Sequence, residues 1–173
     1  MEYTAAVITV SDKGSQGLRE DTSGPALVKM LEAEGYAVSY TATVPDEAAD
    51  IRRELLFCAD EKKLCLVLTT GGTGFSPRDV TPEATESVLE KRAPGIPEAM
   101  RAASLAITPM GCLSRETAGI RGETLIINLP GSKKASTENF AAVIKPVRHG
   151  IDILRGVSHD CAHIHEHGGH HHG

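Results

Sequence analysis

The sequence is poor in aromatic residues: it has no Trp, three Tyr and three Phe among 173 residues. A hydrophobic core must therefore be mainly aliphatic, and few rings are available for stacking on nucleobases. Lys and Arg number 18 against 23 Asp and Glu, which gives a formal net charge of −5. Because nucleic-acid-binding domains need a basic surface, we predict that nucleic acid is not a partner.

Long apolar runs and closely paired cysteines are also missing. Without a run of about 18 apolar residues, the sequence predicts no membrane-spanning helix. The first residues carry no basic segment of the kind that opens a secretory signal. The four cysteines, Cys58, Cys65, Cys112 and Cys161, are widely spaced. They are expected to be reduced thiols in a cytoplasmic protein, with Cys58 and Cys65 in the core.

Short apolar runs alternate with helical patterns along most of the chain. Strands are expected at 5–10, 37–44, 64–68 and 125–129, with a short strand and hairpin turn within 113–123. Helices are expected at about 25–34, 47–61, 82–92, 98–106 and 135–155, the last kinked or split at Pro146. This order predicts an α/β fold of three layers, α/β/α, with a mainly parallel central sheet. We expect one domain, 1–157, followed by a His-rich flexible tail, 158–173.

The stretch from Leu66 to Thr85 is unusually rich in glycine and hydroxyl groups. The predicted central strand is followed by Thr69-Thr-Gly-Gly-Thr-Gly74, then by Ser76, Arg78 and Asp79. Glycines let a ligand approach the backbone closely, and Thr81-Pro82 is typical of an N-cap followed by the first helical residue. A loop that joins a strand to a helix N-terminus is suited to anions. The alternative is a glycine-rich turn without a ligand.

Acidic residues follow several of the predicted strands. In open parallel sheets, ligands bind beyond the carboxyl ends of the strands, which here are the loops at 11–12, 45–46, 69–79 and 130–134. Asp46 and Asp79 could together hold Mg²⁺ beside substrate phosphates. The alternatives are a helix cap for Asp46, an ion pair with Arg78 for Asp79, and an Asx turn for Asp12. Lys133 and Lys134 fit either a phosphate contact or a solvated helix start.

The string from Thr69 to Gly74, continued by Arg78-Asp-Val-Thr-Pro-Glu-Ala-Thr85, closely resembles the signature of the MoaB/Mog family of molybdopterin-binding proteins. Members of that family make or handle the molybdenum cofactor, and their domain also occurs in gephyrin. The resemblance runs from about residue 3 to about 156. Ser114-Arg115 with 118–122, and Leu129-Pro-Gly131, resemble two further signatures. Many relatives have proline where Lys133 stands, which leaves the roles of Lys133 and Lys134 open.

The resemblance implies an activity and a set of site residues. Enzymes of the family adenylylate molybdopterin: its terminal phosphate attacks the α-phosphate of ATP, and pyrophosphate leaves. The essential acids, which would hold Mg²⁺, match Asp46 and Asp79. The residues expected to bind molybdopterin and ATP are Thr70, Gly71, Gly72, Thr73, Gly74, Ser76, Arg78, Ser114, Arg115, Pro130, Gly131 and Ser132.

Other interpretations of the same domain remain open. A protein that only binds or carries molybdopterin would need the glycine loop but no metal-holding acids, and a nucleotide-cleaving enzyme is a third alternative. Relatives are commonly trimers and sometimes hexamers, so the resemblance implies a homotrimer with a hexamer as the alternative, and a molybdenum-insertion protein as a partner. The His-rich tail is either a transition-metal site or a segment without a role in the reaction.

Overall fold

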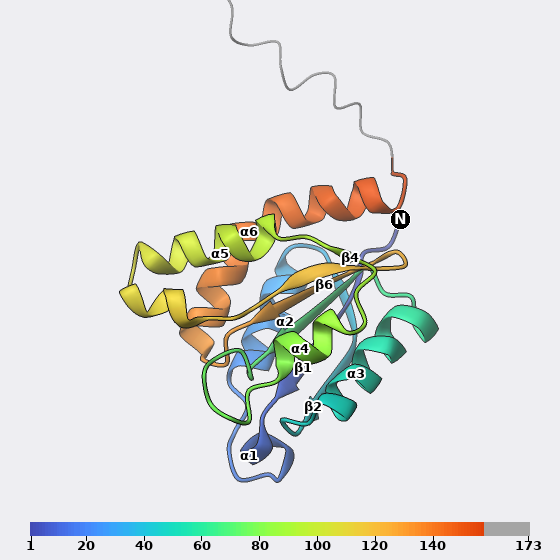
Figure 1. Ribbon diagram of the computed structural model, residues 1–173. Helices are drawn as coiled ribbons and strands as arrows, with labels where there is room; N and C mark the ends of the chain where they lie inside the picture. Colours follow the sequence, from blue (N-terminus) through green and yellow to red (C-terminus); the bar gives the residue numbers. More distant parts are fainter. Residues whose placement is uncertain (158–173) are drawn as a thin grey trace, which may run out of the picture.

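A six-stranded sheet with helices on both faces forms the body of the protein (Figure 1). The computed structural model describes residues 1–157, so the predictions for 158–173 lie outside the described residues. The strands are β1 (Thr4–Val10), β2 (Ala37–Val44), β3 (Leu66–Thr70), β4 (Lys91–Arg92), β5 (Ala118–Arg121) and β6 (Thr124–Leu129). Their order is β2-β1-β3-β6-β5-β4. The first four in this order run parallel. Strand β5 is antiparallel to β6, and β4 is antiparallel to β5, so β4 runs in the direction of the first four.

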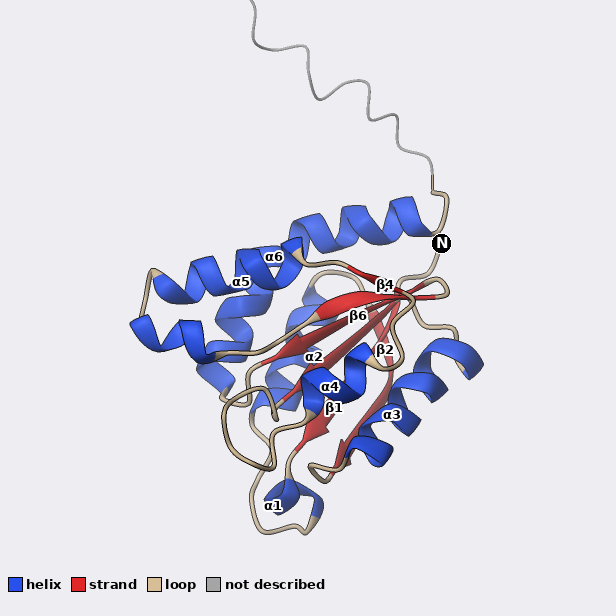
Figure 2. Ribbon diagram, in the orientation of Figure 1, coloured by secondary structure: helices blue, strands red, loops and turns tan. Residues whose placement is uncertain are grey.

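Helices form the two outer layers (Figure 2). They are α1 (Asp12–Ser15), α2 (Ser23–Ala33), α3 (Ala48–Leu56), α4 (Thr81–Glu86), α5 (Gly95–Leu105) and α6 (Lys133–Leu154), with a π-helical turn at Phe57–Glu61 and a 3-10 turn at Pro109–Leu113. Helices α2, α5 and α6 pack together on one face, and α3 and α4 pack together on the other. The predicted α/β/α fold with a mainly parallel sheet is confirmed.

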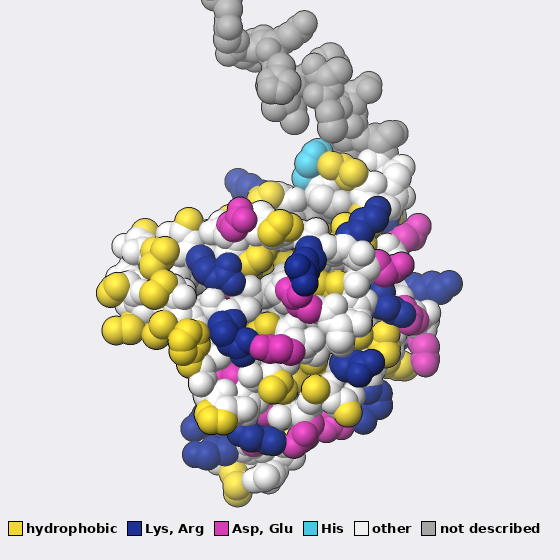
Figure 3. Space-filling view, in the orientation of Figure 1, with side chains coloured by type: hydrophobic (Ala, Val, Ile, Leu, Met, Phe, Trp, Pro, Cys, Tyr) yellow, Lys and Arg dark blue, Asp and Glu magenta, His cyan; other side chains and the backbone are white. Residues whose placement is uncertain are grey.

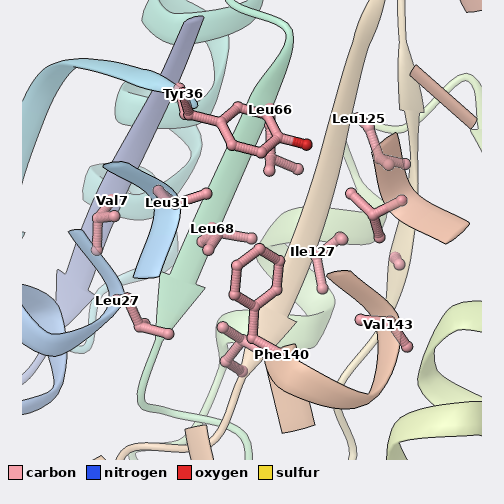
Figure 4. Packing of buried hydrophobic residues seen from close by; sticks show 14 of the residues in the cluster. Val7, Leu27, Leu31, Tyr36, Leu66, Leu68, Leu125, Ile127, Phe140 and Val143 are labelled. Atoms are coloured by element: carbon pink, nitrogen blue, oxygen red, sulfur yellow. The ribbon is translucent and has the colours of Figure 1, made fainter. Parts of the chain in front are cut away.

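The strands divide their side chains between two cores because successive residues of a strand point to opposite faces. Ala5 and Val7 of β1 face the core under α2 and α6, whereas Ala6 and Ile8 face the core under α3 and α4. In the first core, Phe140 of α6 lies among aliphatic side chains of the sheet (Figure 4). Tyr36 is the other ring that Figure 4 labels in this core, and most of the remaining buried side chains are aliphatic, in agreement with the aromatic-poor composition.

The helix predicted at 82–92 is shorter than expected. Helix α4 ends at Glu86, and Lys91–Arg92 instead form the edge strand β4, paired with β5. The prediction that Thr81 caps this helix is also wrong, because Val80 holds the N-cap position and Thr81 is the first helical residue. The buried Thr81 hydroxyl donates to the Gly71 carbonyl at 2.9 Å. Thr81 therefore ties the helix to the glycine loop.

Smaller differences concern where elements begin and end. Strand β3 starts two residues later than predicted, and α5 starts at Gly95 rather than at 98. Helix α6 is continuous through Pro146, although the ribbon changes direction along its length (Figure 1). Cys58 and Cys65 are buried as predicted, and these two and the exposed Cys112 are free thiols. Cys161 lies outside the described residues.

Candidate functional site

A cavity of about 390 Å³ lies at the carboxyl ends of the parallel strands. Four segments meet there: the end of β1, the loop after β2, the glycine loop after β3 and the turn after β6. Their lining residues include Val10, Asp46, Gly71 and Gly131. A larger groove of about 750 Å³ runs along the outer side of α3, but it contains none of the predicted site residues. The topology of the sheet, rather than cavity size, identifies the candidate site.

The cavity gathers half of the predicted site residues. Those that line it are Asp46, Thr70, Gly71, Gly72, Asp79, Gly131 and Ser132. The other seven lie around the glycine loop without lining this cavity: Thr73, Gly74, Ser76, Arg78, Ser114, Arg115 and Pro130. The second group supports the loop or faces solvent, as the contacts below show.

The glycine loop can take its path only with glycine at two positions. Gly71 and Gly72 have φ values of 105° and 69°, in the left-handed region that side chains disfavour. A Cβ atom on Gly71 would lie 2.2 Å from the Val10 carbonyl oxygen, and one on Gly72 would lie 2.3 Å from the Thr81 hydroxyl. The Gly71 N–H donates to the Leu129 carbonyl at 3.1 Å. The Gly72 N–H has no partner within residues 1–157 and is available to an anion.

Hydroxyl groups and a helix N-terminus complete the polar wall. The Thr70 hydroxyl donates to the Pro130 carbonyl at 2.7 Å and lies 3.1 Å from the Ser23 hydroxyl. Ser132 caps α6, since its side chain accepts a hydrogen bond from the Ala135 N–H at 3.1 Å. Helix α6 has 22 residues, so its dipole places partial positive charge at this rim. Phosphate groups bind favourably at such a terminus.

Asp46 and Asp79 each keep one carboxylate oxygen free. Asp46 Oδ2 accepts a hydrogen bond from the Asp12 N–H at 2.9 Å, and Asp79 Oδ2 accepts one from the Ser76 N–H at 3.0 Å. Within the described part of the chain, the other oxygen of each has no hydrogen-bond donor. Burial raises the pKa of Asp46, and the negative charges of Asp12 and Asp79 act in the same direction. The alternative that Asp46 caps α3 is wrong, because Glu47 holds that position.

The two carboxylates, both at the lining of the cavity, are oxygen ligands of the kind that Mg²⁺ prefers. A Cβ atom on Gly72 would lie 3.1 Å from Asp46 Oδ1, and one on Gly74 would lie 3.0 Å from Asp79 Oδ2. Glycine thus leaves space beside both carboxylates. Residues 1–157 contain no cluster of three or more His, Cys, Asp or Glu side chains that could hold a metal ion. Mg²⁺ commonly uses one or two carboxylates and takes its other ligands from water and phosphates.

The two arginines predicted to bind substrate both make protein contacts. Arg78 pairs with Asp12 through Nε and Nη2, both at 3.0 Å, and with Glu47 at 2.8 Å. The alternative of an Arg78–Asp79 pair is therefore wrong. Arg115 forms an ion pair with Glu83, and its side chain donates to the carbonyls of Gly74 at 2.8 Å and Asp79 at 2.9 Å.

The backbone next to Arg115 adds to this support. The Arg115 N–H donates to the Thr73 carbonyl at 2.8 Å, so Arg115 holds both sides of the glycine loop. The preceding Ser114 presents its carbonyl to Arg101 Nε at 2.8 Å. The segment resembling the second family signature therefore fixes the loop that carries Asp79.

Sequence reasoning missed one wall of the cavity. This wall is formed by Arg19, Glu20, Asp21, Thr22 and Ser23, although the sequence pattern indicates only a helix entry at Asp21 to Ser23. Asp21 accepts hydrogen bonds from the Thr9 hydroxyl at 2.6 Å and the Gly24 N–H at 2.9 Å. A run of two acids and two hydroxyls in the connection from β1 through α1 to α2 was the available signal, because that connection leaves the same edge of the sheet.

The fold and the site define an α/β protein with a polar cavity, suited to a phosphate-bearing ligand, at the carboxyl ends of its parallel strands. Residues 6–149 match the family model of a probable molybdopterin binding domain. The chain belongs to this family, the MoaB/Mog family, as its signature motifs implied.

Named relatives cover most of the chain. It is 43% identical over 154 residues to a molybdopterin adenylyltransferase of Helicobacter pylori, covering 87% of this chain and 86% of that protein. It is 44% identical to gephyrin of Dictyostelium discoideum, but there it spans only 23% of the relative's length. Among solved structures, the molybdopterin biosynthesis enzyme MoaB of Thermus thermophilus superposes with a TM-score of 0.85 at 44% identity. That match covers 89% of this chain and 97% of the other.

Proposed function

We propose that this protein is a molybdopterin adenylyltransferase of molybdenum cofactor biosynthesis, with molybdopterin and ATP as its substrates. A relative of that name matches over most of both chains. The observation that carries the proposal is the pair Asp46 and Asp79, each with a free oxygen at the cavity that the glycine loop lines.

Adenylyl transfer needs positioning and charge stabilisation more than a nucleophilic side chain. An oxygen of the terminal phosphate of molybdopterin bonds to the α-phosphorus of ATP. The bond from that phosphorus to the oxygen bridging toward the β-phosphate breaks, and pyrophosphate leaves. The Gly72 N–H, the N-terminus of α6 and the Arg19 side chain at the cavity rim supply positive charge for these phosphates.

Asp46 and Asp79 would hold Mg²⁺, which neutralises charge on the phosphates when it is bound. Negative carboxylates facing anionic substrates would otherwise repel them. Asp46 is half-buried and its pKa is raised by burial and by neighbouring acids, so a cation would be favoured there. The Ser76 N–H orients Asp79, and the Asp12 N–H orients Asp46.

Asp79→Asn separates the enzyme from the carrier. The substitution keeps the size of the side chain and removes its charge, so the fold and the Ser76 contact should persist. Loss of one well-placed electrostatic group costs on the order of 10²–10³ in turnover, and we expect at least that loss in adenylyl-molybdopterin formation from ATP and Mg²⁺. Molybdopterin binding, measured by fluorescence, should change far less. Asp46→Asn should behave similarly.

Product analysis of the parent protein decides among the three interpretations. Adenylyl-molybdopterin with pyrophosphate supports the transferase, molybdopterin binding without a product supports the carrier, and AMP without a pterin adduct supports nucleotide cleavage. The transferase proposal fails if Asp79→Asn forms product at the parental rate under saturating Mg²⁺ and ATP. Equal loss of pterin binding and activity would instead identify Asp79 as a pterin contact.

We also propose a cytoplasmic homotrimer that hands its product to a molybdenum-insertion protein. No helix within residues 1–157 combines the length and apolar character needed to cross a bilayer. Exposed hydrophobic side chains gather at the end of the molecule formed by α5 and the 3-10 turn (Figure 3). They are Leu105, Ile107, Met110 and Leu113. An apolar surface of this kind supports self-association. Light scattering should give three times the chain mass, and Ile107→Asp should reduce it.

A further inference from the structure

Asp12 is the residue through which the two acid-bearing loops are connected. It is the first residue of α1 and follows Ser11, whose side chain caps that short helix. The Asp12 N–H donates to Asp46 Oδ2 at 2.9 Å, and the Asp46 N–H donates to Asp12 Oδ1 at 2.9 Å. These reciprocal hydrogen bonds join the ends of β1 and β2. The first of them occupies Oδ2 of Asp46, and Oδ1 of Asp46 stays available to a ligand.

The same Asp12 carboxylate also receives the guanidinium of Arg78. Nε donates to Oδ2 and Nη2 donates to Oδ1, both at 3.0 Å. Two parallel hydrogen bonds between planar groups fix their relative orientation as well as their distance. Arg78 directly precedes Asp79 in the chain. Asp12 therefore fixes the side chain of one acid and the backbone beside the other.

The Arg78 pair adds little to folding stability. The side chains of Arg78 and Asp12 are 52% and 35% exposed, and ion pairs in such positions stabilise a protein only weakly. The pair does affect the charge of the site. The Arg78 guanidinium contacts the carboxylates of both Asp12 and Glu47 and so offsets part of the negative charge next to Asp46. The Arg78–Asp12 pair therefore matters more for the orientation and charge of the site residues than for the stability of the fold.

We propose that Asp12 is a positioning residue for adenylyl transfer and that Arg78 is its counter-ion rather than a phosphate ligand. The inference rests on the proposed function, because it assigns Asp12 to the acids named there. Asp12 holds the loops of Asp46 and Asp79 in register, so that their free oxygens face one cation together with the substrate phosphates. Removal of partners that orient metal ligands typically costs 10–100-fold in metal affinity or activity.

The test measures Mn²⁺ binding to the full chain in the presence of α,β-methylene ATP, by the electron paramagnetic resonance signal of free Mn²⁺. Both Asp12 variants keep the backbone N–H that donates to Asp46 Oδ2. Asp12→Asn can still accept from the Asp46 N–H but loses the charged pair with Arg78, whereas Asp12→Ala loses both of these side-chain contacts. We expect Mn²⁺ binding to weaken about 10-fold in the first variant and further, within about 100-fold, in the second. Turnover should fall in the same order, while the KM for molybdopterin stays at its parental value.

The chain offers a matched control in Asp60→Asn. Asp60 receives Arg121 through Nε and Nη2, both at 2.9 Å, and does not line the cavity. This variant should lose a pair of the same kind and retain parental Mn²⁺ binding and turnover. If it weakens Mn²⁺ binding as much as Asp12→Asn does, the loss is general and the positioning role is refuted.

Two further comparisons separate the possible failures. Parental Mn²⁺ binding by Asp12→Ala, together with weak binding by Asp46→Asn, would overturn the inference and leave the proposed function intact. Parental binding by Asp46→Asn would remove the metal assignment itself. Asp12→Asn combined with Arg78→Gln should lose no more than Asp12→Asn alone, because the two side chains act as a unit. A loss equal to the product of the two single losses would show that Arg78 acts independently of Asp12.

Discussion

Glu116→Gln should stabilise the protein at pH 8 and change its stability much less at pH 5. Glu116 follows Arg115 and is only 2% exposed. Neither of its carboxylate oxygens has a hydrogen-bond partner within residues 1–157. Arg101 lies nearby, but its guanidinium donates to the carbonyls of Ser114 and Glu116. Burial raises the pKa of Glu116 to about 7, although Ser114 and the charge of Arg101 act in the opposite direction.

The sign and size follow from proton linkage. The carboxyl of the unfolded chain ionises near pH 4.5, so between this pH and about 7 the folded protein keeps a proton that the unfolded chain has released. Stability therefore falls as the pH rises through this window and levels off above about 7. Since one pKa unit corresponds to about 1.4 kcal/mol, the loss between pH 5 and pH 8 is about 2–3 kcal/mol. The Gln side chain carries no charge and escapes this loss.

Urea unfolding of the full chain at pH 5 and pH 8 measures the effect. All samples need one protein concentration, because the stability of an oligomer depends on it. The free energy of unfolding gained by Glu116→Gln should be about 2–3 kcal/mol larger at pH 8 than at pH 5. Glu123→Gln, at an exposed turn position, is the control and should change stability by less than about 0.5 kcal/mol at either pH. An equal gain for Glu116→Gln at both pH values would refute the reasoning.

Three other substitutions test the structural assignments. Thr81→Val removes the buried hydroxyl that donates to Gly71, and should lower stability by about 1–3 kcal/mol; an unchanged melting temperature would contradict this. Gly72→Ala places a Cβ atom 2.3 Å from the Thr81 hydroxyl in a left-handed conformation, so molybdopterin binding should fall strongly, as fluorescence titration would show. Phe140→Ala empties the centre of the first core and should cost about 3–5 kcal/mol in urea unfolding, with the activity of the folded fraction retained.

The longer strands could be predicted well from the residues that form them. The predicted bounds of β2 match the observed ones, and those of β1 differ by one residue. Strands buried on both faces, such as β1 and β6, appear as short continuous apolar runs. In the edge strand β2 only Val44 is buried, and the strand ends just before Pro45. Gly35 follows the C-cap of α2 with a φ of 86°, a position and conformation typical of glycine after a helix. In these cases, the nearest neighbours in the chain decide the conformation.

Helix α4 shows where local sequence is insufficient. The residues from Pro82 onward suit a helix, but Lys91 and Arg92 pair with Ile120 and Gly119 of β5. That pairing joins segments almost thirty residues apart and ends the helix early. The Thr81 hydroxyl likewise bonds Gly71, ten residues away, instead of capping its own helix. Tertiary contacts override propensity at both positions.

The candidate site was predictable as a set of loops but not as a set of contacts. The rule that ligands bind beyond the ends of parallel strands brought Asp12, Asp46 and Asp79 to one edge. Adjacency in sequence suggested that Arg78 pairs with Asp79, whereas its partner Asp12 lies 66 residues away. Which acids pair with protein groups, and which keep a free oxygen, depends on how the loops cross. Only the folded chain contains that information.

The distribution of charge around the cavity argues for an enzyme over a carrier. A carrier of an anionic pterin phosphate would be favoured by neutral or positive groups near its ligand, because like charges repel. Here Arg78 pairs with Asp12 and Glu47, while Asp46 and Asp79 line the cavity and each has an oxygen unused by residues 1–157. Two such carboxylates oppose an anionic ligand unless a cation lies between them and the phosphates. Asp46 and Asp79 are therefore better suited to the proposed adenylyl transfer, in which a cation would lie between these carboxylates and the phosphates of both substrates.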